Sequence, residues 1–209
     1  MTTLRSIDQV VAAVARAAHR DRRTLVGIAG APGAGTSTIA AEVVDALGPT
    51  AVLLPMDGFH LPQATLVELG RRDRMGAPDT FDVPALLAIL DALTVQNSGL
   101  PVRAPGFDRV TEETVPEAIT VSPEFCTVVV EGNYLLFESG IWSRVAEHLD
   151  VSFYIEIDDD VRRERLIARH ERFGKSPEDA RAWTLGPDEA NARIIGATAS
   201  RADYAVSIG

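Results

Sequence analysis

Residues 24–38, T-L-V-G-I-A-G-A-P-G-A-G-T-S-T, join an apolar run to a glycine-rich loop. The apolar first half of this stretch predicts a short buried strand that ends at glycines, and residues 36–47 repeat apolar side chains at helical spacing. A glycine-rich loop between a strand and a helix presents its backbone N–H groups, together with the helix N-terminus, to an anion. The stretch therefore predicts a phosphate-binding loop over residues 30–38.

The loop departs from the usual pattern at one position. Gly30 and Gly35 occupy the glycines of G-x-x-x-x-G-K-[ST], and Ser37 occupies the position whose hydroxyl binds Mg²⁺. Thr36 stands where the pattern has a lysine, so the ammonium that reaches the β- and γ-phosphates is missing. We expect this loss to affect chemistry more than nucleotide binding, because the cradle is mostly backbone. The expected cradle residues are Gly30, Ala31, Pro32, Gly33, Ala34, Gly35, Thr36, Ser37 and Thr38.

Composition limits the classes of protein to consider. A chain of 209 residues is most simply one domain, residues 1–209. The formal net charge of −10 argues against a nucleic-acid-binding surface, and no run of about 20 apolar residues predicts membrane insertion. The single Cys126 excludes an internal disulfide and no export signal is recognisable, so we expect a cytoplasmic protein. A homodimer is left open.

Two further apolar runs lead into carboxylates. Residues 51–55 and 125–130 predict buried strands, and Asp57 and Glu131 follow them. Ligands of open α/β sheets bind at the carboxyl ends of the strands, so we expect both acids beside the phosphate loop. Together with Ser37 they form a candidate Mg²⁺ site. The alternative for Asp57 is an ordinary turn or helix-capping residue.

An arginine-rich helix is predicted after the strand at residues 151–157. It starts at residues 158–160 and allows two interpretations. The charges form a solvated face opposite Leu166, Ile167 and Phe173, or the guanidiniums bind a polyphosphate. Lys175, the only lysine, allows the same two interpretations: a solvated surface charge or a phosphate-binding cation. The arginines concerned are Arg162, Arg163, Arg165, Arg169 and Arg172.

The remaining pattern alternates strands with helices. It predicts an α/β protein with a mostly parallel sheet covered on both faces. A first helix follows Ser6 and ends in the basic cluster 20–23; others span about 61–74, 84–95, 142–149, 177–183 and 189–198. Residues 100–121 predict short strands outside the main sheet, residues 186–188 predict a helix break, and residues 204–208 predict a last strand.

With these motifs in hand, the chain resembles the P-loop kinases related to uridine kinase and bacterial pantothenate kinase. It resembles most closely the bacterial branch described as nucleoside/nucleotide kinase-like or fructose-transport-system kinase (fructokinase-like). The resemblance runs from Val26 to Tyr204 through G-A-P-G-A-G-T-S-T, P-M-D-G-F-H-L, R-M-G-A-P-D-T-F-D, P-G-F-D-R-V-T-E-E, V-V-V-E-G-N-Y-L-L and R-R-E-R-L-I-A-R-H. It implies a P-loop NTPase three-layer α/β/α sandwich with an arginine-rich lid at about residues 159–187, and a phosphotransferase that uses ATP and Mg²⁺.

The resemblance also implies roles for individual residues. Asp57 would take the proton of the acceptor hydroxyl, Glu131 would hold Mg²⁺, and Arg169 would act in catalysis with Arg165 at the phosphates. Lys175 is a further candidate at the nucleotide. The implied acceptor residues, within the segment 58–123, are Phe59, His60, Arg74, Asp79 and Phe81. A sugar, a nucleoside or a pantothenate-like alcohol fits as the acceptor, and polar side chains around Arg103, Asp108 and Arg109 could bind any of them.

Two functions remain open at this point. In the first, Arg165, Arg169 or Lys175 replaces the missing charge on lid closure, and the protein is an active small-molecule kinase. In the second, it binds nucleotide with little turnover and acts as a regulator. The presence of Ser37, Asp57 and Glu131 favours the kinase, because a binding module needs no base for a hydroxyl.

Overall fold

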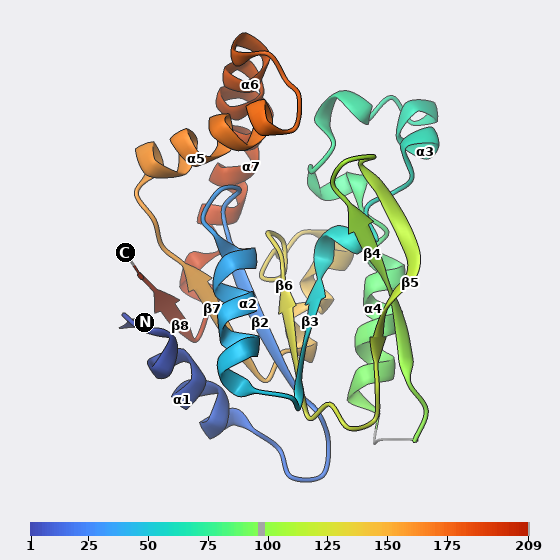
Figure 1. Ribbon diagram of the computed structural model, residues 1–209, viewed down its shortest axis with the longest axis vertical. Coiled ribbons are helices and arrows are strands. Elements are labelled where there is room, and N and C mark those ends of the chain that lie inside the picture. The colour runs from blue at the N-terminus through green and yellow to red at the C-terminus, as the bar shows by residue number, and fades with distance from the viewer. Residues whose placement is uncertain (96–98, 209) are drawn as a thin grey trace.

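A parallel sheet forms the centre of the protein. The computed structural model describes residues 1–95 and 99–208. In the described chain the sheet strands are β1 (Thr2–Leu4), β2 (Thr24–Gly30), β3 (Ala51–Pro55), β6 (Thr127–Glu131), β7 (Val151–Ile155) and β8 (Tyr204–Val206). Their order is β1-β8-β7-β2-β6-β3, and every neighbouring pair is parallel. The phosphate-loop strand β2 thus lies between β7 and β6, near the middle of the sheet (Figure 1).

Helices cover both faces of this sheet, as the alternation of strand and helix predicted. Val26 and Ile28 of β2 pack with α1 (Ile7–Ala17) and α2 (Thr36–Leu47), which lie side by side in Figure 1. Leu25 and Ala29, which point to the other face, share a core with α4 (Val83–Thr94) and α7 (Glu189–Gly196). Successive strand residues face opposite sides, so one apolar strand supplies both cores. The fold is the expected three-layer α/β/α sandwich.

The segment 58–123 contains α3 (Gln63–Glu68) and an antiparallel hairpin of β4 (Val102–Asp108) and β5 (Glu113–Val121), apart from residues 96–98, which lie outside the described residues. The hairpin, yellow-green in Figure 1, stands outside the main sheet as expected. It packs closely on the turn that follows β3, because a Cβ atom built on Gly58 would lie 2.3 Å from the carbonyl oxygen of Pro105. This contact places the hairpin beside Asp57.

The segment 159–187 forms α5 (Asp159–Arg172), α6 (Pro177–Trp183) and a π-helical turn (Thr184–Asp188) that continues into α7. The predicted break at residues 186–188 is therefore wrong. Pro187 lacks an N–H and would clash with the carbonyl four residues earlier in a regular α-helix, and the wider π turn accommodates it. Figure 1 shows α5 and α6 at the same end of the molecule as α3.

Other differences concern short elements. The helix expected over 61–74 ends at Glu68, with Gly70 at a φ of 63°, and a separate 3-10 turn covers Arg72–Arg74. The helix expected over 142–149 is two 3-10 turns, Gly140–Arg144 and Ala146–His148. Strand β1 was not predicted, since three residues carry no readable periodicity.

The basic cluster does not end the first helix, which stops at Ala17. Arg22 instead pairs with Asp150, and the buried Arg23 donates to the carbonyl of Phe125. The cluster therefore connects the start of β2 to the segments that lead into its neighbours β6 and β7. Across the described residues, no helix is both long and apolar enough to cross a membrane.

Candidate active site

The phosphate loop lines one wall of a cavity of about 880 Å³. Gly33 and Gly35 have φ angles of 83° and 90°, which L-residues with side chains rarely adopt, and Gly35 is the N-cap of α2. Residues 32–38 all line the cavity, whereas Gly30 and Ala31 do not. The N-terminus of a twelve-residue helix thus faces the cavity, as an anion-binding site requires.

Ser37 and Glu131 meet at the floor of this cavity. The Ser37 hydroxyl donates to Oε1 of Glu131 over 3.1 Å, and the Glu131 residue is only 4% exposed. Burial, together with the nearby negative charge of Asp57, raises the pKa of Glu131 to about 7, although hydrogen bonds from Ser37 and Thr36 favour the ionised form. The carboxylate pair expected from two strand ends does come together.

The oxygen donors of Ser37, Glu131 and Asp57 fit Mg²⁺, which prefers carboxylate, hydroxyl and phosphate oxygens. The buried Glu131 carboxyl, whose ionisation is disfavoured by the nearby charge of Asp57, is a place where a cation is stabilising. Among the described residues no group of three or more His, Cys, Asp or Glu side chains could hold a metal alone.

Asp57 is held by Arg109, which the sequence suggested as a possible contact of the acceptor but not as a partner of Asp57. Nη2 of Arg109, at the end of the hairpin, donates to Oδ2 of Asp57 over 2.9 Å. The Asp57 side chain remains 30% exposed and lines the cavity, so its other oxygen can reach a ligand. Arg109 belongs to the motif P-G-F-D-R, so the sequence marks this segment. Its contact with Asp57 depends on the pairing of β4 with β5, which the motif does not predict.

His60 forms an aromatic wall with Phe81 and Phe107. Its ring centroid lies 4.0 Å from that of Phe81 and 4.9 Å from that of Phe107. Nδ1 is 2.8 Å from the carbonyl oxygen of Asp57, and because a carbonyl only accepts, Nδ1 carries the hydrogen. Burial lowers the pKa of His60, which favours the neutral ring. Nε2 is then a hydrogen-bond acceptor in a cavity-lining residue.

The other expected acceptor residues lie elsewhere. Phe59 is 2% exposed within the hydrophobic core, and Arg74 pairs with Asp79, with 2.7 Å between Nη2 and Oδ2. None of these three lines the cavity, whereas His60 and Phe81 do. Roles in acceptor binding for Phe59, Arg74 and Asp79 stay predictions. Arg109, suggested as an acceptor contact, also lines the cavity, and so do Phe107, Trp183 and Asn191, which the sequence did not point to.

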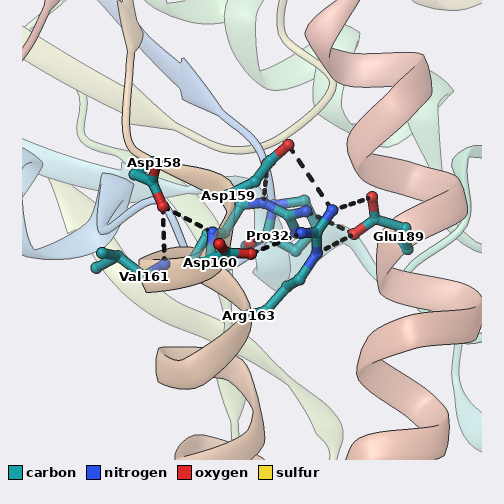
Figure 2. Close-up of polar contacts among 8 residues, drawn as sticks. Pro32, Asp158, Asp159, Asp160, Val161, Arg163 and Glu189 are labelled. Carbon is teal, nitrogen blue, oxygen red and sulfur yellow. Dashed lines mark hydrogen bonds and ion pairs between the residues drawn. The ribbon is translucent and has the colours of Figure 1, made fainter.

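The arginines of α5 divide into two groups. Arg162, 1% exposed, and Arg163 both donate to the Glu189 carboxylate of α7 (Figure 2). Hydrogen bonds from Arg163 and Arg162 lower the pKa of Glu189 to about 2. The solvated-face interpretation is wrong for Arg162, and of its expected packed side Leu166 is buried but Phe173 is half exposed. Both arginines have a structural role.

The second group lines the cavity and consists of Arg165, Arg169 and Arg172, with Lys175 beyond the helix. Burial lowers the pKa of Arg169, and the like charge of Arg109 adds to this effect. Nζ of Lys175 lies 4.5 Å from the ring centroid of Trp183, a cation–π contact. Arg169 and the carboxylates of Asp57 and Glu131 therefore line the same cavity, while Lys175 lies against Trp183.

Sequence comparison identifies relatives over most of the chain. Residues 25–207 match the model of the phosphoribulokinase / uridine kinase family. A Schizosaccharomyces pombe protein named "Putative uridine kinase" is 32% identical over 79% of this chain and 74% of its own length. A pantothenate kinase of Rhodopseudomonas palustris is 32% identical over 69% of this chain, which spans only 48% of that enzyme.

Structural comparison agrees. A crystal structure of a "putative fructose transport system kinase" from Silicibacter sp. TM1040 has a TM-score of 0.88 and 35% sequence identity, and covers 96% of this chain and 98% of its own. YFH7 from Saccharomyces cerevisiae, at 18% identity, shares the fold with a TM-score of 0.84 and covers 98% of this chain and 99% of its own. The chain therefore belongs to the phosphoribulokinase / uridine kinase family and has the fold of the P-loop kinases.

Proposed function

We propose that the protein transfers the γ-phosphoryl group of ATP to a hydroxyl of a small sugar or nucleoside-like acceptor. The observation that carries this proposal is the meeting of three parts in one cavity: the phosphate loop, the Ser37–Glu131 pair and an Asp57 carboxylate that is open to a ligand. Phosphoryl transfer needs mainly positioning and charge neutralisation, and these parts supply both. Membership of a kinase family agrees with this proposal.

Each part has a role in the proposed reaction. The loop N–H groups hold the phosphates, and Asp57 accepts the proton as the acceptor oxygen bonds to the γ-phosphorus and the bond to the bridging oxygen breaks, which releases ADP. Ser37, Glu131 and Asp57 would hold Mg²⁺, which neutralises phosphate charge when bound. Arg109 keeps the Asp57 carboxylate oriented through its contact with Oδ2.

The acceptor wall supports a sugar or nucleoside. Nε2 of neutral His60 can accept a hydrogen bond from a hydroxyl, and the rings of Phe81 and Phe107 offer flat apolar surface to a sugar or a base. The names of the relatives, a uridine kinase and a fructose transport system kinase, point to the same classes.

The alternative is a nucleotide-binding regulator with little turnover. It is favoured by one observation, that the lysine of the loop pattern is replaced by Thr36, which is 8% exposed. Its Cγ2 lies on the side of the loop toward Gly30, and because its side chain is uncharged, Thr36 brings no positive charge to a phosphate.

ADP formation from ATP and Mg²⁺, measured across sugars, nucleosides and pantothenate, separates the two functions. We expect one acceptor class to stimulate ADP formation and to yield an equal amount of phosphorylated product. If ATP binds but no acceptor in the panel stimulates ADP formation, the kinase proposal fails and the regulator is the better account.

A further inference from the structure

The arginine-rich helix is packed directly against the phosphate loop. A Cβ atom built on Gly33 would lie 2.7 Å from Cγ of Leu166 and 2.8 Å from the carbonyl oxygen of Arg162. Both distances are shorter than real Cβ contacts, so only glycine allows this approach of loop and helix. The first half of α5 therefore packs against the loop in the structure, and no closing motion is needed to bring it there.

Ion pairs hold the same half of α5 in place. Arg162 donates to Asp159 over 2.9 Å, to Glu189 over 2.6 Å and to the carbonyl oxygen of Pro32 in the loop over 3.5 Å. Arg163 adds two bonds to Glu189, as Figure 2 shows. Since Arg162 is buried and α7 belongs to the core, these bonds join helix, loop and core into one unit.

Arg165 is the cation that this arrangement brings to the loop. Its Nη1 lies 3.6 Å from a Cβ atom built on Gly35, the residue directly before Thr36. Its residue is exposed and lines the cavity. Within residues 1–95 and 99–208, Arg162 and Arg163 are engaged by carboxylates, whereas Arg165 has no ion pair. A guanidinium without a carboxylate partner beside a phosphate loop is available to an anion.

The other cations are placed differently. Arg169 lines the same cavity and is near enough to the charges of Arg109, Asp188, Asp57 and Glu131 for them to affect its pKa. Lys175 lies over the Trp183 ring. Arg165 is the cation whose guanidinium lies against Gly35, the N-cap of α2, directly before the position where the usual pattern has its lysine. Arg172, which also lines the cavity, is the last residue of α5, about two helical turns further along.

We propose that Arg165 supplies, from a preset position, the positive charge that Thr36 does not bring to the β- and γ-phosphates. This proposal rests on the nucleotide binding of the proposed function but not on any particular acceptor. As the bond from the γ-phosphorus to the bridging oxygen breaks and the acceptor oxygen bonds to phosphorus, negative charge moves onto the β-phosphate. A guanidinium already at the loop stabilises that charge without a closing motion.

The first test measures equilibrium binding without any acceptor. Dissociation constants for ADP and for a non-hydrolysable ATP analogue are compared in the wild type and in Arg165→Ala, Arg165→Lys, Arg169→Ala and Arg181→Ala. Arg181 is the matched control, since it is an exposed arginine of α6 outside the cavity. We expect Arg165→Ala to weaken binding of the triphosphate about 10- to 100-fold, with a smaller loss for ADP, and Arg165→Lys to recover part of it.

Arg181→Ala should leave both constants unchanged. If Arg165→Ala keeps the wild-type ratio of triphosphate to diphosphate affinity, or if Arg169→Ala alone lowers it, the assignment of Arg165 is overturned. A failure of Arg165→Lys to recover any affinity also counts against a charge role. Because no acceptor is present, these outcomes are separate from a failure of the kinase proposal, which would appear only in the acceptor panel.

The second test restores the usual lysine. In Thr36→Lys the loop carries its own ammonium, so Arg165 should matter less. The fold-loss of triphosphate affinity caused by Arg165→Ala should be at least ten times smaller in Thr36→Lys than in the wild type. An equal cost in both backgrounds would mean that the two side chains do not share a role, and would overturn the proposal. If Thr36→Lys does not fold, the comparison of Arg165→Ala with Arg165→Lys decides alone.

Discussion

The phosphate-binding half of the cavity comes from one continuous run, residues 32–38, whereas the acceptor half is assembled from side chains far apart in the chain. The loop works through backbone N–H groups whose geometry depends on glycines at fixed positions. The acceptor half needs Asp57, His60 and Phe81 to meet Phe107 and Arg109 of a separate hairpin. Because the two halves are built from different segments, we expect mutations in one half to leave the function of the other largely intact.

The largest expected effect belongs to Asp57. In Asp57→Asn the acceptor hydroxyl loses its base, and we expect turnover to fall by about 10²–10⁴-fold while affinity for the ATP analogue changes little. Steady-state kinetics with the best acceptor, together with equilibrium binding, measure the two quantities. Full activity in Asp57→Asn would remove Asp57 from the proposed mechanism.

Gly33→Ala should damage the other half. The new Cβ would overlap Leu166 and the carbonyl of Arg162 at a positive φ, so we expect a loss of about 2–4 kcal/mol in the free energy of unfolding or in nucleotide binding. Denaturant unfolding and binding of the ATP analogue measure it. Gly196→Ala in α7 is the control, because nothing lies within 4 Å of its Cβ position. Equal behaviour of the two variants would contradict the close packing of loop and helix.

Glu131 lies at the border of the two halves and should make stability depend on pH. Its pKa is raised from 4.5 to about 7, so between these values the folded chain holds a proton that the unfolded chain has lost. Without Mg²⁺, stability should therefore fall by about 3 kcal/mol at most as pH rises through this range. In Glu131→Gln this fall should be absent, and the variant should be more stable than the wild type at pH 8.

Urea unfolding between pH 5 and 8 measures the effect, and Glu68→Gln, in exposed α3, is a control for loss of one carboxylate. If the free energy of unfolding changes with pH in the same way in the wild type and in Glu131→Gln, Glu131 is ionised over the whole range and the prediction is wrong.

The smallest expected effect concerns Phe107. Removal of its ring in Phe107→Ala leaves His60 with Phe81 alone, and we expect the KM for the acceptor to rise about 5- to 10-fold, with little change in ATP affinity. Acceptor and ATP titrations measure the two values. An equal rise in both would mean that the two halves of the cavity are coupled through this ring.

The local parts of this protein could be predicted from the sequence because their causes are local. The glycine spacing and apolar periodicity identify β2, the loop and α2, and the side chains of Ser6, Asp82 and Ser176 cap helices as a short-range pattern predicts. The strand ends that carry Asp57 and Glu131 follow from the rule that parallel strands present their carboxyl ends at one edge.

The rest depended on contacts between distant residues. Strand β1 is three residues long and exists because β8, at the other end of the chain, pairs with it. The π turn at Pro187, the pairing of Arg109 with Asp57 and the clamp of Arg162 on Glu189 join segments that no sequence period relates. Periodicity reports which face of an element is buried, but not which charge on another element it will meet.

A phosphate loop without its lysine, a parallel α/β fold and two carboxylates at neighbouring strand ends follow from the order of residues alone. The division of the arginines depends on the folded chain, because all five in α5 look alike in the sequence. Arg162 and Arg163 bind Glu189, while Arg165 is left beside Gly35. The physical reason is packing: Gly33 lets α5 approach the loop, and that approach sets which guanidinium reaches the phosphate site.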